Sequence, residues 1–189
     1  MDELDALCMR LGGPDEAASR LAAQARELEA ERAPRLAIAV RGCRELEESG
    51  EAHRPAAETQ LSTAVATELA EACARLARNE REALALKELI GLDHSELAAV
   101  LEVDAVSVAP LLAGARIALR AELRGVPTQL GECVEHERTL RTATLRQDGE
   151  AVRAEDEDWL YEHLGRCEEC ARAHSAMLEG SSCYRGWPT

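Results

Sequence analysis

Apolar residues recur every three or four positions along most of the 189-residue chain, which is the period of an amphipathic helix. Glycines, prolines and short polar runs separate these stretches. Pro34 interrupts one of them, because its ring cannot continue a helix that has already begun. We interpret residues 1–78 as one helical domain. Its predicted helices cover residues 2–11, 14–32, 35–48 and 55–77.

The segment 79–125 carries the clearest helix signals. Asn79 is followed three residues later by Glu82, and Asp93 is followed by Glu96. Each pair has the spacing of a capping box, in which two side chains bind the free backbone N–H groups at a helix start. Helix, turn, short helix, turn and longer helix form a helix-turn-helix. The predicted helices cover residues 79–90, 93–101 and 104–124.

A proline lies inside the last of these helices. Pro110 would cost about 3 kcal/mol in a helix interior. We therefore expect that the helix either begins after this residue or bends at it.

The last third of the chain begins with a linker rich in turn residues, Gly125 to Gly131, which marks a domain boundary. Beyond it the pattern predicts a helix over residues 133–147, a turn at 148–150, and one helix from 154 to about 178. We interpret residues 126–189 as a separate small domain.

The composition favours an all-α protein. The chain has no Phe and only four aromatic residues, two Trp and two Tyr, although 46% of its residues are hydrophobic. Its core must therefore be built from Leu, Ala and Val, most of which favour helices.

The charge favours protein partners over nucleic acid. The net charge is −14, whereas phosphate contacts made by basic side chains supply most non-specific DNA affinity. No apolar run approaches the ~20 residues that cross a bilayer, and the first residues are acidic where a signal peptide is basic. We expect a cytoplasmic protein with no membrane segment.

Three potential metal ligands follow one another at close spacing: His163, Cys167 and Cys170. Residues three and four apart share one helix face, so we expect the three on one helical stripe. Zn²⁺ takes four such ligands in structural sites. Cys133 is the preferred fourth ligand because a third thiolate binds zinc tightly, and His136 is the alternative.

Two other interpretations of these cysteines remain. A cysteine is often an ordinary core residue. A Cys-x-x-Cys pair can also be a redox dithiol, but that chemistry is typical of a helix that follows a strand, and no strand is predicted here. Seven cysteines in a chain without an export signal favour reduced thiols and a metal over disulfides.

The segment from Arg81 through Asp93-His-Ser-Glu-Leu-Ala-Ala-Val-Leu101 to Arg120 resembles the promoter-reading C-terminal domain of extracytoplasmic-function sigma factors. Arg10 to Ala17 and Ala33 to Arg44 are similar to that family's N-terminal domain. The resemblance implies that the last helix of the helix-turn-helix enters the DNA major groove.

The residues that the resemblance places toward DNA are Ser107, Arg116 and Arg120. The same helix carries Ala, Pro and Gly where family members have several basic residues, and residues 1–158 have no aromatic ring to hold flipped promoter bases. We expect a sigma-like scaffold that has lost much of its promoter reading.

The C-terminal cysteines carry a second resemblance. Cys133, the turn Asp148-Gly-Glu150 and His163-Leu-x-x-Cys167-x-x-Cys170 are similar to the zinc-binding anti-sigma factor domain. That family implies a small zinc-clipped helical unit that binds sigma factors, and His136 is nearer than Cys133 to the usual spacing of its fourth ligand.

The sequence contains no pattern typical of catalysis, so we expect no enzyme and no small-molecule substrate. The leading hypothesis is an all-α transcription regulator: a helical bundle with a helix-turn-helix, followed by a zinc-clipped domain. It would act by contact with RNA polymerase or with a sigma or anti-sigma partner. The alternatives are a sigma factor that binds promoter DNA directly and a redox switch in which thiol oxidation expels zinc.

Overall fold

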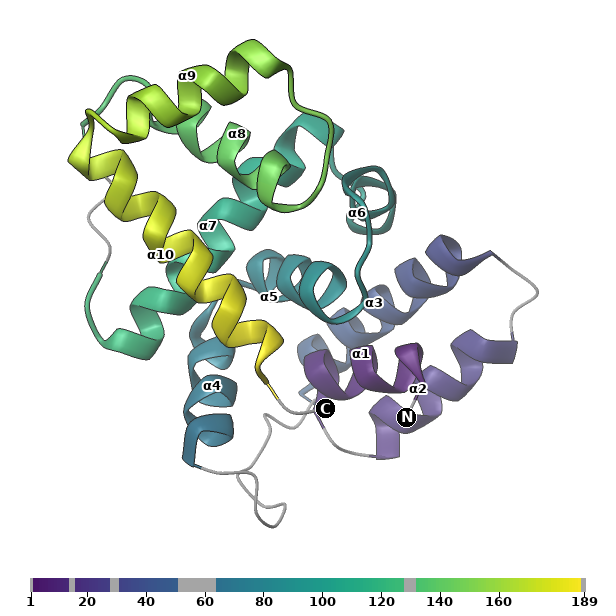
Figure 1. Ribbon diagram of the computed structural model, residues 1–189. Coiled ribbons are helices and arrows are strands. Elements are labelled where there is room, and N and C mark those ends of the chain that lie inside the picture. The colour runs from purple at the N-terminus through teal and green to yellow at the C-terminus, as the bar shows by residue number, and fades with distance from the viewer. Residues whose placement is uncertain (1, 14–15, 28–30, 51–63, 128–131, 188–189) are drawn as a thin grey trace.

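The computed structural model describes residues 2–13, 16–27, 31–50, 64–127 and 132–187, and every regular element in these segments is helical (Figure 1). The prediction of an all-α fold is confirmed. Helices α1 to α3 lie together at one end of the molecule, α8 and α9 lie at the other, and α10 runs between the two ends. The elements are α1 Glu3–Gly12, α2 Glu16–Glu27, α3 Arg32–Ser49, α4 Ala64–Arg75, α5 Arg78–Leu84, η1 Ala85–Leu89, α6 His94–Leu101, α7 Ala105–Arg124, α8 His136–Gln147, α9 Ala154–Leu164 and α10 Glu168–Arg185.

The two helices predicted on either side of Pro34 are present, but the boundary lies before the proline. Helix α3 begins at Arg32, so Pro34 lies in its first turn. The N–H groups of a first turn have no acceptor within the helix, and a proline there removes no hydrogen bond. Residues 14–15, 28–30 and 55–63, parts of the predicted helices, lie outside the described residues.

The start of the helix-turn-helix differs by one residue from the prediction. Helix α5 begins at Arg78, and the carboxylate of Glu80 accepts a hydrogen bond of 3.0 Å from the backbone N–H of Ala77. Glu82, the predicted capping residue, is instead buried and forms a two-bond ion pair with Arg44 of α3. This ion pair joins the helix-turn-helix to the N-terminal helices.

The second predicted capping box is present as expected. The Glu96 carboxylate accepts a hydrogen bond from the Asp93 N–H, and Asp93 accepts one from the Glu96 N–H, at 3.0 and 2.8 Å. Helix α7 begins at Ala105, one residue from the predicted start, and runs through Pro110, so the alternative in which the helix begins after the proline is excluded. The carbonyl that Pro110 leaves without an N–H partner belongs to Val106, an exposed residue, where water can bind it.

Two further boundaries in the C-terminal third differ from the prediction. Helix α8 begins at His136, so Cys133 lies in the turn before it. The single helix expected over residues 154–178 is two helices, α9 and α10, separated at residues 165–167. The chain turns sharply at this break, and α10 then crosses the molecule along α7 (Figure 1).

The buried residues form two hydrophobic clusters. The larger cluster combines α1 to α7 with Tyr184 near the end of α10. The smaller cluster combines Ala113 and Ile117 of α7 with residues of α8, α9 and α10. Helix α7 therefore contributes to both cores. Among the described residues no single helix has the length and hydrophobicity of a membrane span, and α6 with α7 meets that test only as a pair bent by 93°.

The end of α10 also packs against the first helix. The guanidinium of Arg10 lies 3.6 Å from the ring centre of Trp187 and 5.6 Å from that of Tyr184. Cation–π contacts of this kind are worth about 0.5–2 kcal/mol each. The two ends of the described chain are therefore in contact.

Candidate metal centre

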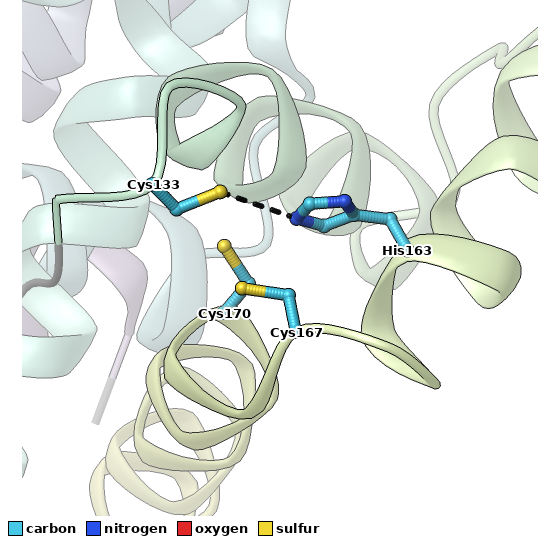
Figure 2. Close-up of side chains that lie close together, drawn as sticks. All are labelled: Cys133, His163, Cys167 and Cys170. Carbon is cyan, nitrogen blue, oxygen red and sulfur yellow. Dashed lines mark hydrogen bonds between the residues drawn. The ribbon is translucent and has the colours of Figure 1, made fainter.

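Four side chains from three separate segments converge at the junction of α8, α9 and α10 (Figure 2). Cys133 comes from the turn before α8, His163 from the end of α9, and Cys167 and Cys170 from the start of α10. Their ligand atoms all lie within 4.8 Å of one another, and Cys133 Sγ is 3.5 Å from His163 Nε2. The cluster could hold a metal ion.

The spacing of these atoms suits a tetrahedral ion. With Zn–S distances of ~2.3 Å and Zn–N of ~2.0 Å, sulfurs lie about 3.8 Å apart and a sulfur and a nitrogen about 3.6 Å apart. The distance between Cys133 and His163 already matches that value, and small side-chain movements would bring the others to it. All four coordination positions would be filled by protein, which is typical of a structural site.

The expectation that His163, Cys167 and Cys170 share one stripe of one helix is wrong. His163 lies in the last turn of α9, Cys167 is the N-cap of α10 and Cys170 lies in the first turn of α10. Donors along one straight stripe would point side by side. The turn between α9 and α10 instead lets the imidazole extend from α9 toward Cys133, while the two sulfurs project from the start of α10 toward the same point (Figure 2).

The position of Cys167 at the start of α10 favours its thiolate form. The backbone N–H of Cys170 donates to the Cys167 sulfur, and this contact lowers the pKa of the thiol. Free N–H groups at a helix start favour negative charge in the same way. A thiolate is the form that binds metal.

Cys170 lies deeper in the structure. Its side chain is buried, and burial raises the pKa of its thiol to about 12. Thr139 of α8 contacts the same sulfur. A bound cation would displace the proton and neutralise the buried charge.

His163 is held by aromatic stacking within α9. The ring of Trp159, one turn earlier in α9, stacks on the imidazole at 5.2 Å and 13°. The guanidinium of Arg138 lies 3.8 Å from the centre of the same indole. This stack fixes the imidazole plane, so that Nε2 faces Cys133 (Figure 2).

His136, the alternative fourth ligand, lies beside the cluster. Its Nδ1 is 3.9 Å from Cys170 Sγ, and its buried Nε2 has no hydrogen-bond partner among the described residues. The four residues whose ligand atoms lie within 4.8 Å of one another include Cys133 and not His136.

A comparison with known proteins finds no matching family model, curated protein or solved structure.

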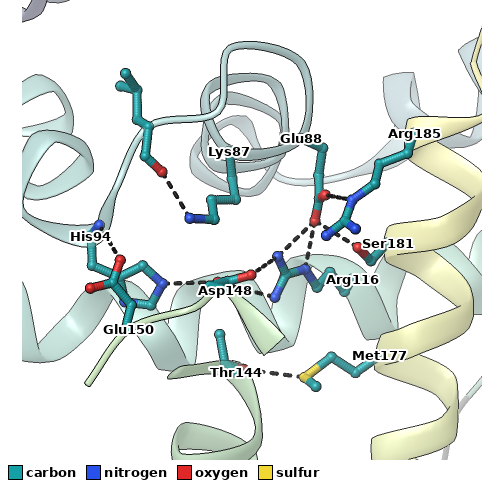
Figure 3. A network of polar contacts seen from close by, with 11 residues as sticks. Lys87, Glu88, His94, Arg116, Thr144, Asp148, Glu150, Met177, Ser181 and Arg185 are labelled. Carbon is teal, nitrogen blue, oxygen red and sulfur yellow. Dashed lines mark hydrogen bonds and ion pairs between the residues drawn. The ribbon is translucent and has the colours of Figure 1, made fainter. Parts of the chain in front are cut away.

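The residues expected to read DNA lie in different environments. Ser107 is exposed in the first turn of α7. Arg116 is fully buried, so the expectation that it faces DNA does not hold in this structure: its guanidinium binds Asp148 at 2.6 Å and Glu88 at 2.7 Å (Figure 3). Arg120 is half-buried and donates to Glu179 of α10 at 3.2 Å.

Asp148 is the centre of a buried polar network that joins the end of α8 to the helix-turn-helix (Figure 3). It accepts hydrogen bonds from Arg116 of α7 and, at 2.8 Å, from Nε2 of His94 of α6. Burial acts to raise the pKa of Asp148, but these hydrogen bonds outweigh it, and the pKa is lowered below its usual value. The carboxylate is therefore charged at neutral pH.

The same network reaches α10 through Glu88 of η1. Glu88 accepts hydrogen bonds from Ser181 at 3.0 Å and from Arg185 at 2.6 Å, as well as from Arg116. No role was predicted for Glu88 or Glu179, and Asp148 was predicted only to lie in a turn. These acids lie tens of residues along the chain from the α7 arginines that they bind, and helical periodicity carries no information over such separations.

Proposed function

We propose that the protein is a transcription regulator in which a zinc-bound C-terminal unit, α8 to α10, holds the α5–α7 helix-turn-helix within the same chain. It would act by contact with RNA polymerase or with a sigma or anti-sigma partner. The helix-turn-helix would descend from a sigma-like domain, and the C-terminal unit from an anti-sigma-like one. In this proposal the protein does not read promoter DNA while the two units are docked.

One observation carries this proposal: the arginines of α7 are bound by acids of the unit that follows. Arg116 binds Asp148, while Arg120 and Arg124 both bind Glu179. A phosphate or base edge would have to displace these carboxylates before it could reach the guanidinium groups. The net charge of −14 adds a general repulsion toward DNA.

Zinc is the ion that the donor set favours. Three thiolates and one imidazole are good ligands for a borderline-soft ion, whereas Mg²⁺ and Ca²⁺ prefer oxygen. A closed site contributes folding energy and no open position for catalysis. The small core of α8 to α10 has most to gain from such an ion.

The test compares protein and DNA partners of the zinc-loaded full chain. We expect it to capture core RNA polymerase or a purified extracytoplasmic-function sigma factor and to retain no sequence from a random duplex DNA pool. Glu179→Ala frees two arginines and should increase DNA retention, while Glu168→Ala, which removes an exposed carboxylate at the start of α10, should not. Selective DNA retention or promoter-dependent run-off transcription by the wild-type protein would overturn the proposal in favour of a working sigma factor.

A second candidate function is a thiol redox switch, favoured by one observation. Cys133, His163 and Cys167 are only half-buried, so a small oxidant can reach two of the three sulfurs. Oxidation by hydrogen peroxide would pair two thiols in a disulfide, reduce the peroxide to water and release the metal. Zinc retention under peroxide that oxidises an exposed reference thiol would exclude this function.

A further inference from the structure

A second feature of the molecule lies on the side of α7 that faces α4 and α10. The three helices and the turn after α10 line a half-open cavity of about 390 Å³. Sites for small organic molecules usually measure about 300–1,000 Å³, with apolar walls and a few polar groups that fix the orientation of the ligand. The cavity is separate from the metal cluster, which lies at the opposite end of α10.

One wall of the cavity carries two guanidinium groups that share a single carboxylate. Arg120 and Arg124 lie one turn apart on α7, and both donate to Glu179 of α10. Glu68 of α4 also lines the cavity, but it is exposed and forms no ion pair among the described residues. The arginine pair therefore has unused N–H donors, and its two positive charges face one carboxylate that is bound, Glu179, and one that is not, Glu68.

The rest of the cavity is suited to an apolar body. Leu69, Leu123, Gly186 and Trp187 line it. Cys183 adds a half-buried thiol to the same wall. A ligand with no charge would cover the arginine donors without replacing their water, which costs free energy. A ligand with several charges would have to bring them against leucine and tryptophan side chains.

We propose that this cavity binds a small amphipathic monocarboxylate, such as a medium-chain fatty acid or an aromatic acid. Its carboxylate would accept hydrogen bonds from Arg120 and Arg124, a geometry that planar guanidinium groups favour. Its apolar body would lie against Leu69, Leu123 and Trp187. Because Glu179 uses the same two arginines, the bound acid would compete with it and weaken the contact between α7 and α10. The inference goes beyond the proposed function and does not depend on it.

The test uses the zinc-loaded full chain with sodium octanoate as the probe and 1-octanol as its uncharged counterpart. Binding is followed by the rate at which iodoacetamide modifies Cys183, measured by peptide mass spectrometry, and by tryptophan emission in a Trp159→Phe variant, where Trp187 is the remaining indole. We expect octanoate to slow the modification of Cys183 at least about tenfold more effectively than octanol, the difference expected for one or two charge-assisted hydrogen bonds.

Variants locate the site. Arg124→Gln, whose side chain is exposed, should weaken octanoate binding by about tenfold or more without affecting folding. Arg141→Gln removes an exposed arginine that lines a different hollow, between α8 and α9, and should leave binding unchanged. Equal protection by octanol, unchanged octanoate binding in Arg124→Gln, or an equal loss in Arg141→Gln would each overturn the proposal. Glu179→Gln should strengthen octanoate binding, because it removes the competing carboxylate.

Discussion

Gly180 of α10 lies directly against the backbone carbonyl of Arg116 of α7: a Cβ atom built on Gly180 would be 2.0 Å from that oxygen. No side chain can occupy this position unless the two helices separate. The contact lies beside the buried ion pairs of Arg116, and so it controls how closely the C-terminal unit approaches the helix-turn-helix.

Gly180→Ala should therefore destabilise the protein by about 1–3 kcal/mol, the usual cost of overpacking a tight contact. The measurement is urea unfolding followed by circular dichroism. Gly114→Ala is the matched control, since Gly114 is in α7 and its Cβ would meet no atom within 4 Å. That variant should gain about 0.5–1 kcal/mol through helix propensity. Equal effects of the two variants would contradict the close contact.

Cys133→Ser should lower zinc affinity by about 100-fold or more, because it removes one of the four converging donors. Loss of a residue that only supports a ligand already costs about 10–100-fold, and loss of a ligand itself should cost at least as much. His136→Ala should retain one bound zinc per chain. Elemental analysis of the purified variants, with competition against a chromophoric chelator, measures both. Loss of zinc in His136→Ala with full retention in Cys133→Ser would show that the histidine is the fourth ligand.

Trp159→Ala should weaken zinc binding by about tenfold, since the indole stacks on His163 and fixes the imidazole plane. Trp159→Phe retains an aromatic face and should bind nearly as well as the wild type. Chelator competition at constant pH gives the two affinities. Equal binding by the Ala and Phe variants would mean that the stack does not orient the ligand.

Asp148→Asn should cost about 3–5 kcal/mol of unfolding free energy at pH 7, because it leaves the fully buried Arg116 with one charged partner fewer. The folded-state pKa of Asp148 is lowered below its usual value of 3.8, so its contribution is complete above that pH and is lost as the pH falls through the lower, folded-state pKa. The difference between wild type and variant should shrink over that acidic range. Urea unfolding between pH 7 and pH 3 measures it.

The control for this prediction is Glu168→Gln, which removes an exposed carboxylate paired with Arg172 on the surface of α10. It should change stability by no more than about 0.5 kcal/mol at any of these pH values. A pH-independent gap between the wild type and Asp148→Asn would contradict the assigned titration.

Spacing in the sequence identified donors that the fold brings together, because a metal cluster leaves a local signature at His163, Cys167 and Cys170. The spacing could not predict how these side chains are oriented relative to one another. The break at residues 165–167 has no proline, and its one glycine has an ordinary right-handed conformation, so periodicity alone continued the helix. The turn between α9 and α10 follows only from the tertiary structure, in which the imidazole of His163 and the cysteine sulfurs converge.

The environment of the α7 arginines was beyond sequence analysis for a different reason. Arg116, Arg120 and Arg124 repeat every four residues, which is also the pattern of a solvated helix face. Their partners Asp148 and Glu179 are 32 and 59 residues away from Arg116 and Arg120, respectively. Only tertiary structure decides that this face is covered by protein. The helical content, by contrast, followed from local apolar spacing and composition.

The contact of Arg10 with Trp187 brings the segment that follows α10 against α1. Helix α10, about 27 Å long at 1.5 Å per residue, begins at the metal cluster and ends on the first helix. A single helix therefore connects the cysteine cluster with α1. Removal of Trp187 would take away its contact with Arg10 and weaken the attachment of α1 to the end of α10, even with every cysteine in place.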